Sequence, residues 1–192
     1  MNKIEEAYRL AASVRRKFIM AAFGGFVIIS GLELLDQKSG NKFNTSVIFG
    51  FFIFYLFLFI FIINTPSVKG CFIGSLLYKS LEKLGYANEF VKTIDYEVKN
   101  DLIIDYHNED YKISFFVTKT WFVYISPSSS VIRKLSEIST VSRKIKTSRR
   151  RKIERNILHI DFTDGSYFTE LFSFASDEIF ELFKEEFPSY TC

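Results

Sequence analysis

Two long apolar segments in the first third of the chain constrain its fold more than any other feature. They occupy residues 18–35 and 46–63, have 18 residues each, and together contain one Glu and no Lys, Arg or Asp. A helix of this length reaches roughly 27 Å, close to the roughly 30 Å hydrocarbon thickness of a bilayer. Each segment is therefore expected to form a membrane-spanning helix.

The connection between the two segments predicts how they are arranged. Residues 36–45 read DQKSGNKFNT, which is polar turn material short enough to force an antiparallel hairpin. Arg15, Arg16 and Lys17 directly precede the first segment, whereas the connection carries only two lysines, offset by Asp36. The positive-inside rule then predicts a multi-pass protein of the cytoplasmic membrane with both termini in the cytoplasm.

Two alternatives concern the first apolar segment. A cleaved secretory signal is disfavoured, because the apolar run exceeds the roughly 7–15 residues of a signal core and no small-residue cleavage site follows. Gly24, Gly25 and Gly31 allow close packing either of the two helices on each other or of two hairpins in a dimer. Cys71 and Cys192 are the only cysteines, which argues against a disulfide scaffold or a zinc site and fits a reducing compartment.

The rest of the chain divides into a connector and one domain. We expect a basic N-terminal segment at 1–17, the hairpin at 18–66, and an amphipathic helical connector at 67–92 in which Leu residues recur at helical spacing. From residue 93 to 192, short β-branched and aromatic runs predict six or seven strands. Asp164-Gly165 predicts a hairpin, and SDEIFELFKEEFP predicts a closing helix that ends at Pro188.

This order of elements resembles the pleckstrin-homology-like domain, and more narrowly the small bacterial membrane proteins that join two spans to such a domain. The matching pieces are VTKTWFVYI, IRKLSEISTV, ILHIDFTDGSYFTELFSF and the closing helix. The resemblance implies an α+β membrane protein, with a transmembrane helical hairpin followed by an antiparallel β-barrel or sheet capped by a C-terminal helix. Its motifs are structural and none is catalytic, so it supports a fold more than a function.

A basic run at residues 143–155 is the strongest functional candidate. It contains eight cations and one acid in a protein of net charge +3, and it is expected to lie in an extended hairpin or long loop. Such a run suits an anionic lipid surface or an acidic protein, although a merely solvated loop is somewhat more favoured and nucleic acid is less favoured. The candidate contact residues are Arg143, Lys144, Lys146, Arg149, Arg150, Arg151, Lys152 and Arg155.

No constellation of residues indicates an enzyme or a cofactor. His107 and His159 are the only histidines, and they have no convergent ligands at a recognisable spacing, as a metal site would need. The serines of residues 126–130 have no paired base. We therefore predict a membrane-anchored binding or scaffold module without a cofactor, whose partners are the lipid bilayer and an anionic lipid or protein. The alternative is an oligomeric subunit associated with transport or a pore, and a homo-oligomer is compatible with either.

Overall fold

The fold, seen in a computed structural model, combines helices with β-strands. The structure describes residues 2–36, 45–63, 65, 70–147, 154–169 and 173–191, except for the side chains of 2, 30, 31, 33–36, 45–51, 146, 147, 154–156 and 173–176. The helices are α1 (Asn2–Asp36), α2 (Thr45–Ile63), α4 (Leu76–Lys83), α5 (Ala87–Asn100) and α6 (Ser173–Glu186). The strands are β1 (Leu102–Asn108), β2 (Ile113–Thr118), β3 (Trp121–Ile125), β4 (Ser130–Lys134), β5 (Ile138–Thr147), β6 (Glu154–Phe162) and β7 (Tyr167–Thr169).

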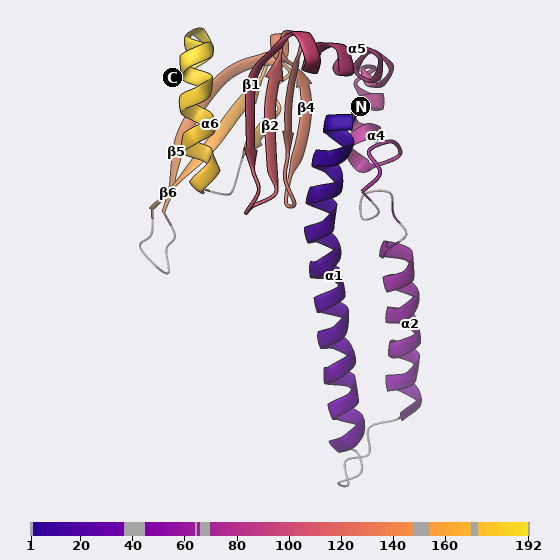
Figure 1. The fold of residues 1–192 in the computed structure, drawn as a ribbon. Coiled ribbons are helices and arrows are strands. Elements are labelled where there is room, and N and C mark those ends of the chain that lie inside the picture. Colours follow the sequence, from indigo (N-terminus) through magenta and orange to yellow (C-terminus); the bar gives the residue numbers. More distant parts are fainter. Residues whose placement is uncertain are drawn as a thin grey trace.

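The seven strands form two antiparallel sheets. Strands β1 to β4 pair in sequence order in a four-stranded sheet, and β5 to β7 pair in sequence order in a three-stranded sheet. Figure 1 shows the second sheet and α6 on one side of the first sheet, with α1, α4 and α5 on the other. The molecule is therefore layered, and the four-stranded sheet lies in its middle.

Helices cover one face of the four-stranded sheet. Ile4, Ala7, Tyr8 and Ala11 recur at helical spacing in α1 and are buried with α4, α5 and the side chains of Trp121 and its neighbours. Arg15 fixes the same helix to the turn between β3 and β4, because its guanidinium donates hydrogen bonds of 2.8 Å to two carbonyl oxygens of that turn. The first half of α1 is thus an integral part of the domain.

The second sheet and α6 cover the other face. Ile179, Phe180 and Phe183 of α6 are buried in one cluster with Phe115 and Phe122 of the four-stranded sheet. Because successive side chains of a strand point to opposite faces, β2 and β3 supply both clusters and are buried along their whole length. Such continuously apolar strands are typical of a sheet that is covered on both sides.

The predicted hairpin at Asp164-Gly165 is confirmed between β6 and β7, and the predicted closing helix is found as α6, which begins at Ser173. Gly165 has a φ of 78°, a conformation that glycine adopts readily. The predicted single antiparallel barrel or sheet is wrong, because the strands pair in two separate sheets. A break at the short segment Leu135–Glu137 turns the chain from β4 into the second sheet.

The prediction of a transmembrane hairpin also needs correction. Among the helical residues that the structure describes, none form a helix both long and apolar enough to cross a membrane. By this criterion, the membrane spans predicted at 18–35 and 46–63 are wrong. The predicted multi-pass placement in the cytoplasmic membrane, with both termini in the cytoplasm, is wrong for the same reason. The first apolar segment is instead the continuation of α1, which begins at Asn2 inside the domain. The side chains of 33–51 lie outside the described residues.

Candidate functional site

The basic run predicted from the sequence lies on the hairpin of β5 and β6. These strands pair from Ile138–Phe162 to Thr147–Glu154, and residues 148–153 that join them lie outside the described residues. Lys146 is the register partner of Arg155, immediately before the last pair of the ladder. This end of the β5–β6 ladder lies at the lower left in Figure 1.

The structure treats the individual cations of the run differently. Arg143 is engaged by α6, since its guanidinium lies 3.4 Å from Asp177, 3.9 Å from Glu181 and over the ring of Phe180. Lys144 is exposed. For Lys146 and Arg155 only the backbone is described, and Arg149, Arg150, Arg151 and Lys152 lie outside the described residues.

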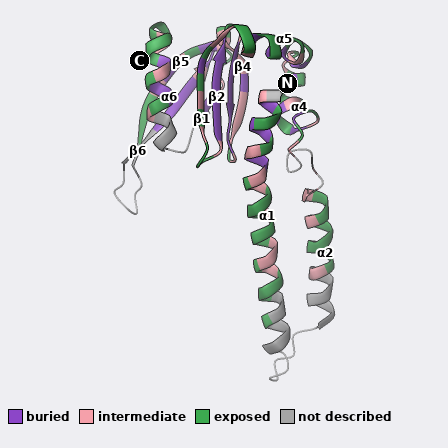
Figure 2. Cartoon of the chain, viewed as in Figure 1, coloured by how far each residue is buried: buried purple, intermediate pink, exposed green. Residues whose placement is uncertain are grey.

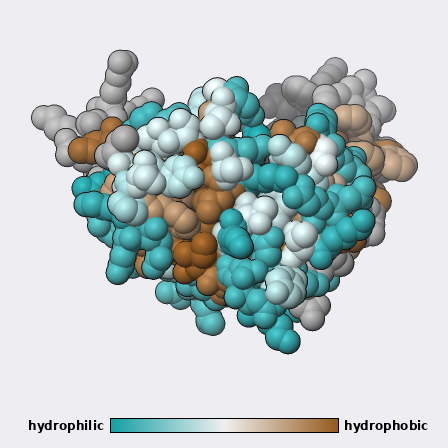
Figure 3. Space-filling view, turned by 90° about the horizontal axis from the view of Figure 1, so that it is seen from above, coloured by the Kyte–Doolittle hydropathy of each residue, from teal (hydrophilic) through white to brown (hydrophobic). Residues whose placement is uncertain are grey.

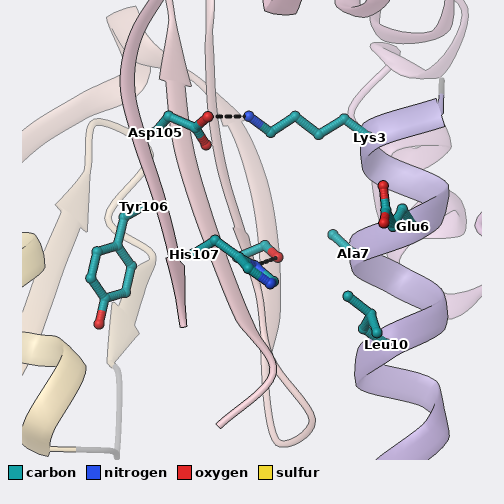
Figure 4. Close-up of a pocket in the computed structure, with 8 residues that line it drawn as sticks. Lys3, Glu6, Ala7, Leu10, Asp105, Tyr106 and His107 are labelled. Carbon is teal, nitrogen blue, oxygen red and sulfur yellow. Dashed lines mark hydrogen bonds and ion pairs between the residues drawn. The ribbon is translucent and has the colours of Figure 1, made fainter. Parts of the chain in front are cut away.

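A second candidate site is a polar groove between α1 and β1, which Figure 4 shows in close-up. Its volume is about 180 Å³. Lys3 of α1 reaches across to Asp105 of β1, with 2.5 Å between the ammonium nitrogen and a carboxylate oxygen. His107 points towards α1, and its Nδ1 forms a 3.0 Å hydrogen bond with Ser114 Oγ. The groove is lined by Lys3, Glu6, Ala7, Leu10, Asp105, Tyr106, His107 and Ser114.

The chemistry of this groove is limited. Lys3 and Asp105 neutralise each other, which leaves the exposed carboxylate of Glu6, the imidazole of His107 and the phenol of Tyr106 as its remaining ionisable groups. Tyr106 points away from α1. Its pKa lies above the ordinary value, mainly because the phenol is partly buried and to a smaller extent because it forms a hydrogen bond with Glu178. In the described part of the chain, no three His, Cys, Asp or Glu side chains converge as a metal site would require.

The two histidines occupy different sheets and do not meet. His159 on β6 uses both ring nitrogens, with Nδ1 3.1 Å from Thr169 Oγ1 and Nε2 2.9 Å from Asp161 Oδ1. Its ring also stacks on Tyr167, with 5.3 Å between the centroids. The contacts with Thr169 and Tyr167 connect β6 to β7, so His159 stabilises the pairing of these two strands.

The basic hairpin could be predicted from the sequence, but the groove could not. The hairpin is visible as a local run of cations, whereas Lys3 and Asp105 are 102 residues apart in sequence. The only local signal for the groove was the cluster of polar residues around His107.

Comparison with known proteins adds no relative: no protein family, no curated protein and no solved structure matches this chain. The resemblance to pleckstrin-homology-like domains is therefore not tested by these comparisons and stays a prediction.

Proposed function

We propose that this protein is a binding module whose β5–β6 hairpin holds an acidic segment of a protein partner. The observation that carries the proposal is the charge at the end of this hairpin. Residues 143–155 hold eight cations against a single acid, Glu154, and the strand register sets Lys146 opposite Arg155. Like charges directly opposite each other weaken a strand pair, so this register favours a partner that brings negative charge. An acidic segment of a partner would supply that charge.

Arg143 supports this proposal because it is a cation of the same run that binds carboxylates. Its partners, Asp177 and Glu181, both belong to α6, and Arg143 pairs with Leu158 well before the end of the ladder. The fold thus supplies acids for the cation nearest the domain. The cations at 149–152 lie in sequence between Thr147 and Glu154, the two residues of the last strand pair.

The test measures binding of a labelled glutamate-rich peptide to the full chain by fluorescence anisotropy. The variant changes Arg149, Arg150, Arg151 and Lys152 to Gln. The control changes four exposed lysines of α4 and α5 to Gln, which removes the same charge elsewhere: Lys79, Lys83, Lys92 and Lys99. An exposed ion pair contributes about 0.2–1 kcal/mol, and about 1.4 kcal/mol is tenfold in affinity. We therefore expect the affinity of the hairpin variant for the peptide to fall about tenfold or more, and that of the lysine control to change little.

Two further measurements test the proposal: the salt dependence of peptide binding, and binding to anionic phospholipid vesicles. Affinity for the peptide should fall steeply between low and physiological salt, because exposed charges are screened within about 8 Å at 0.15 M. Equal losses in the hairpin variant and the lysine control would show that only net charge matters and would contradict the proposal. Binding to anionic phospholipid vesicles without binding to the peptide would instead identify a lipid surface as the partner.

A further inference from the structure

The second half of α1 and the helix α2 form an arm that projects from the domain, which we call the apolar arm and define as residues 18–29 and 52–63. The two helices contact each other through aromatic side chains. Phe23 stacks on Phe59 with 4.1 Å between ring centroids, and Phe26 lies 4.2 Å from Tyr55 by the same measure. The arm is thus a preformed helical hairpin.

The outer faces of the apolar arm are exposed. Figure 2 shows exposed and intermediate residues along it, in contrast to the buried strands of the domain. On α2, Phe54, Phe57 and Phe61 recur at three- and four-residue spacing and expose 61%, 69% and 73% of their surface. On α1, Phe18 and Ile28 expose 76% and 64%. Helix α2 therefore presents a bulky apolar ridge, and α1 adds exposed apolar side chains to the surface of the arm.

The size of this surface indicates that something covers it. One aromatic side chain presents about 150–250 Å², so the exposed apolar residues of the arm present on the order of 1,500 Å². The largest apolar patch on an ordinary monomer is about 300–600 Å². By comparison, the domain end seen in Figure 3 is mostly hydrophilic, with a limited apolar area near its middle.

We propose that a second copy of this chain covers the apolar arm, so that two arms pack as a four-helix bundle. A stable interface needs about 800 Å² from each partner, which the exposed surface of one arm exceeds. The arm also meets the chemical requirement for burial, since residues 18–29 and 52–63 contain no Asp, Glu, Lys, Arg or His. Packing two arms together therefore buries no unpaired charge.

The test uses disulfide cross-linking in intact cells, with the full chain carrying a single cysteine. In a background with Cys71→Ser and Cys192→Ser, the introduced cysteines are Phe54→Cys, Phe57→Cys and Phe61→Cys, each tested alone. The matched control is Leu76→Cys on α4, which is 76% exposed but lies outside the arm. After mild oxidation, at least one ridge position should give a species of twice the chain mass, and the control should remain a single chain.

A mass measurement on the purified chain checks the same proposal independently. Light scattering should give a dimer for the unaltered protein and a monomer for the triple variant of Phe54, Phe57 and Phe61 to Ser, with Leu76→Ser remaining a dimer. An unchanged thermal transition of the domain in the triple variant establishes that it is folded. A monomeric unaltered chain, equal cross-linking at Leu76→Cys, or a monomer that floats with lipid vesicles would overturn the proposal, the last by identifying lipid as the occupant.

Discussion

The phenolic hydroxyl of Tyr86 donates a hydrogen bond to Oε1 of Glu137 over 2.6 Å. Tyr86 precedes α5 in the helical layer, whereas Glu137 lies in the short segment that leads into β5. The other carboxylate oxygen of Glu137 lies 3.6 Å from Arg133, and its backbone carbonyl accepts a hydrogen bond from Thr163. This one residue therefore joins the helical layer to both sheets.

Tyr86→Phe should destabilise the protein in a pH-dependent way. The hydrogen bond and the negative charge of Glu137 raise the pKa of Tyr86 above its ordinary value of 10.0, because they favour the neutral phenol. A raised pKa in the folded state gives stability that is complete below pH 10 and is lost as the pH rises through the raised value. Thermal unfolding from pH 7 to 11 should show the variant melting below the unaltered protein, with the difference narrowing above pH 10.

The control for this measurement is Tyr96→Phe on α5, which removes the hydroxyl of a tyrosine that is 66% exposed. It should melt like the unaltered protein at every pH. A difference between Tyr86→Phe and the unaltered protein that stays constant up to pH 11 would contradict the assigned role of Glu137.

Asp164→Asn should remove part of the acid sensitivity of the fold. Hydrogen bonds from the Ser166 hydroxyl and backbone amide, and the charge of Arg133 at 3.1 Å, lower the pKa of Asp164 below its ordinary value of 3.8. A lowered pKa in the folded state gives stability that is present above pH 3.8 and is lost as the pH falls through the lowered value. Urea unfolding should therefore separate the two proteins near neutral pH and bring them together towards pH 2.5.

Asp110→Asn, in the exposed turn between β1 and β2, is the matched control and should shift little. If the separation between Asp164→Asn and the unaltered protein grew on acidification, the interactions assigned to this carboxylate would be wrong.

Ile4→Ala tests whether the first half of α1 belongs to the domain. Ile4 is 1% exposed and packs in the cluster between α1, α4, α5 and the four-stranded sheet. Removing a buried aliphatic side chain of this size costs about 2–4 kcal/mol, through lost transfer energy and the cavity left behind. Phe18→Ala on the same helix removes a side chain that is 76% exposed and should change the unfolding free energy of the domain little. Denaturant unfolding of both variants measures the contrast, and equal losses would contradict the role of Ile4.

The strands could be predicted from the sequence because their signals are local. Runs such as WFVYI are rich in β-branched and aromatic residues, and Trp121, the first residue of this run, is fully buried. Their division between two cores follows from the period of two: Phe115 lies in the cluster facing α6, and Phe116 in the cluster facing α1. The continuous apolar character of these strands was the signal that both faces are covered.

The arrangement of the strands and the groove could not be predicted in the same way. The same run of short strands can form either two sheets or one barrel. Which of them forms depends on the pairing of strands that lie far apart in the sequence. The contact of Lys3 with Asp105 depends on how α1 docks, which hydropathy does not reveal. In α1, the long apolar run at 18–35 predicted a membrane span. The helical spacing of Ile4, Ala7 and Ala11 was the signal that the first half of this helix packs on the sheet.

Two glycines with the same backbone conformation should respond differently to alanine. Gly70 and Gly85 have φ values of 81° and 77°, so alanine at either position incurs the left-handed penalty of about 1–2 kcal/mol. A Cβ at Gly70 would also lie 3.1 Å from Cα of Arg9 and 3.4 Å from Cβ of Ala12, whereas a Cβ at Gly85 meets nothing within 4 Å. Overpacking of this kind adds about 1–3 kcal/mol. Urea unfolding should therefore show a larger loss for Gly70→Ala than for Gly85→Ala, and equal losses would mean that the segment after α2 does not pack against α1.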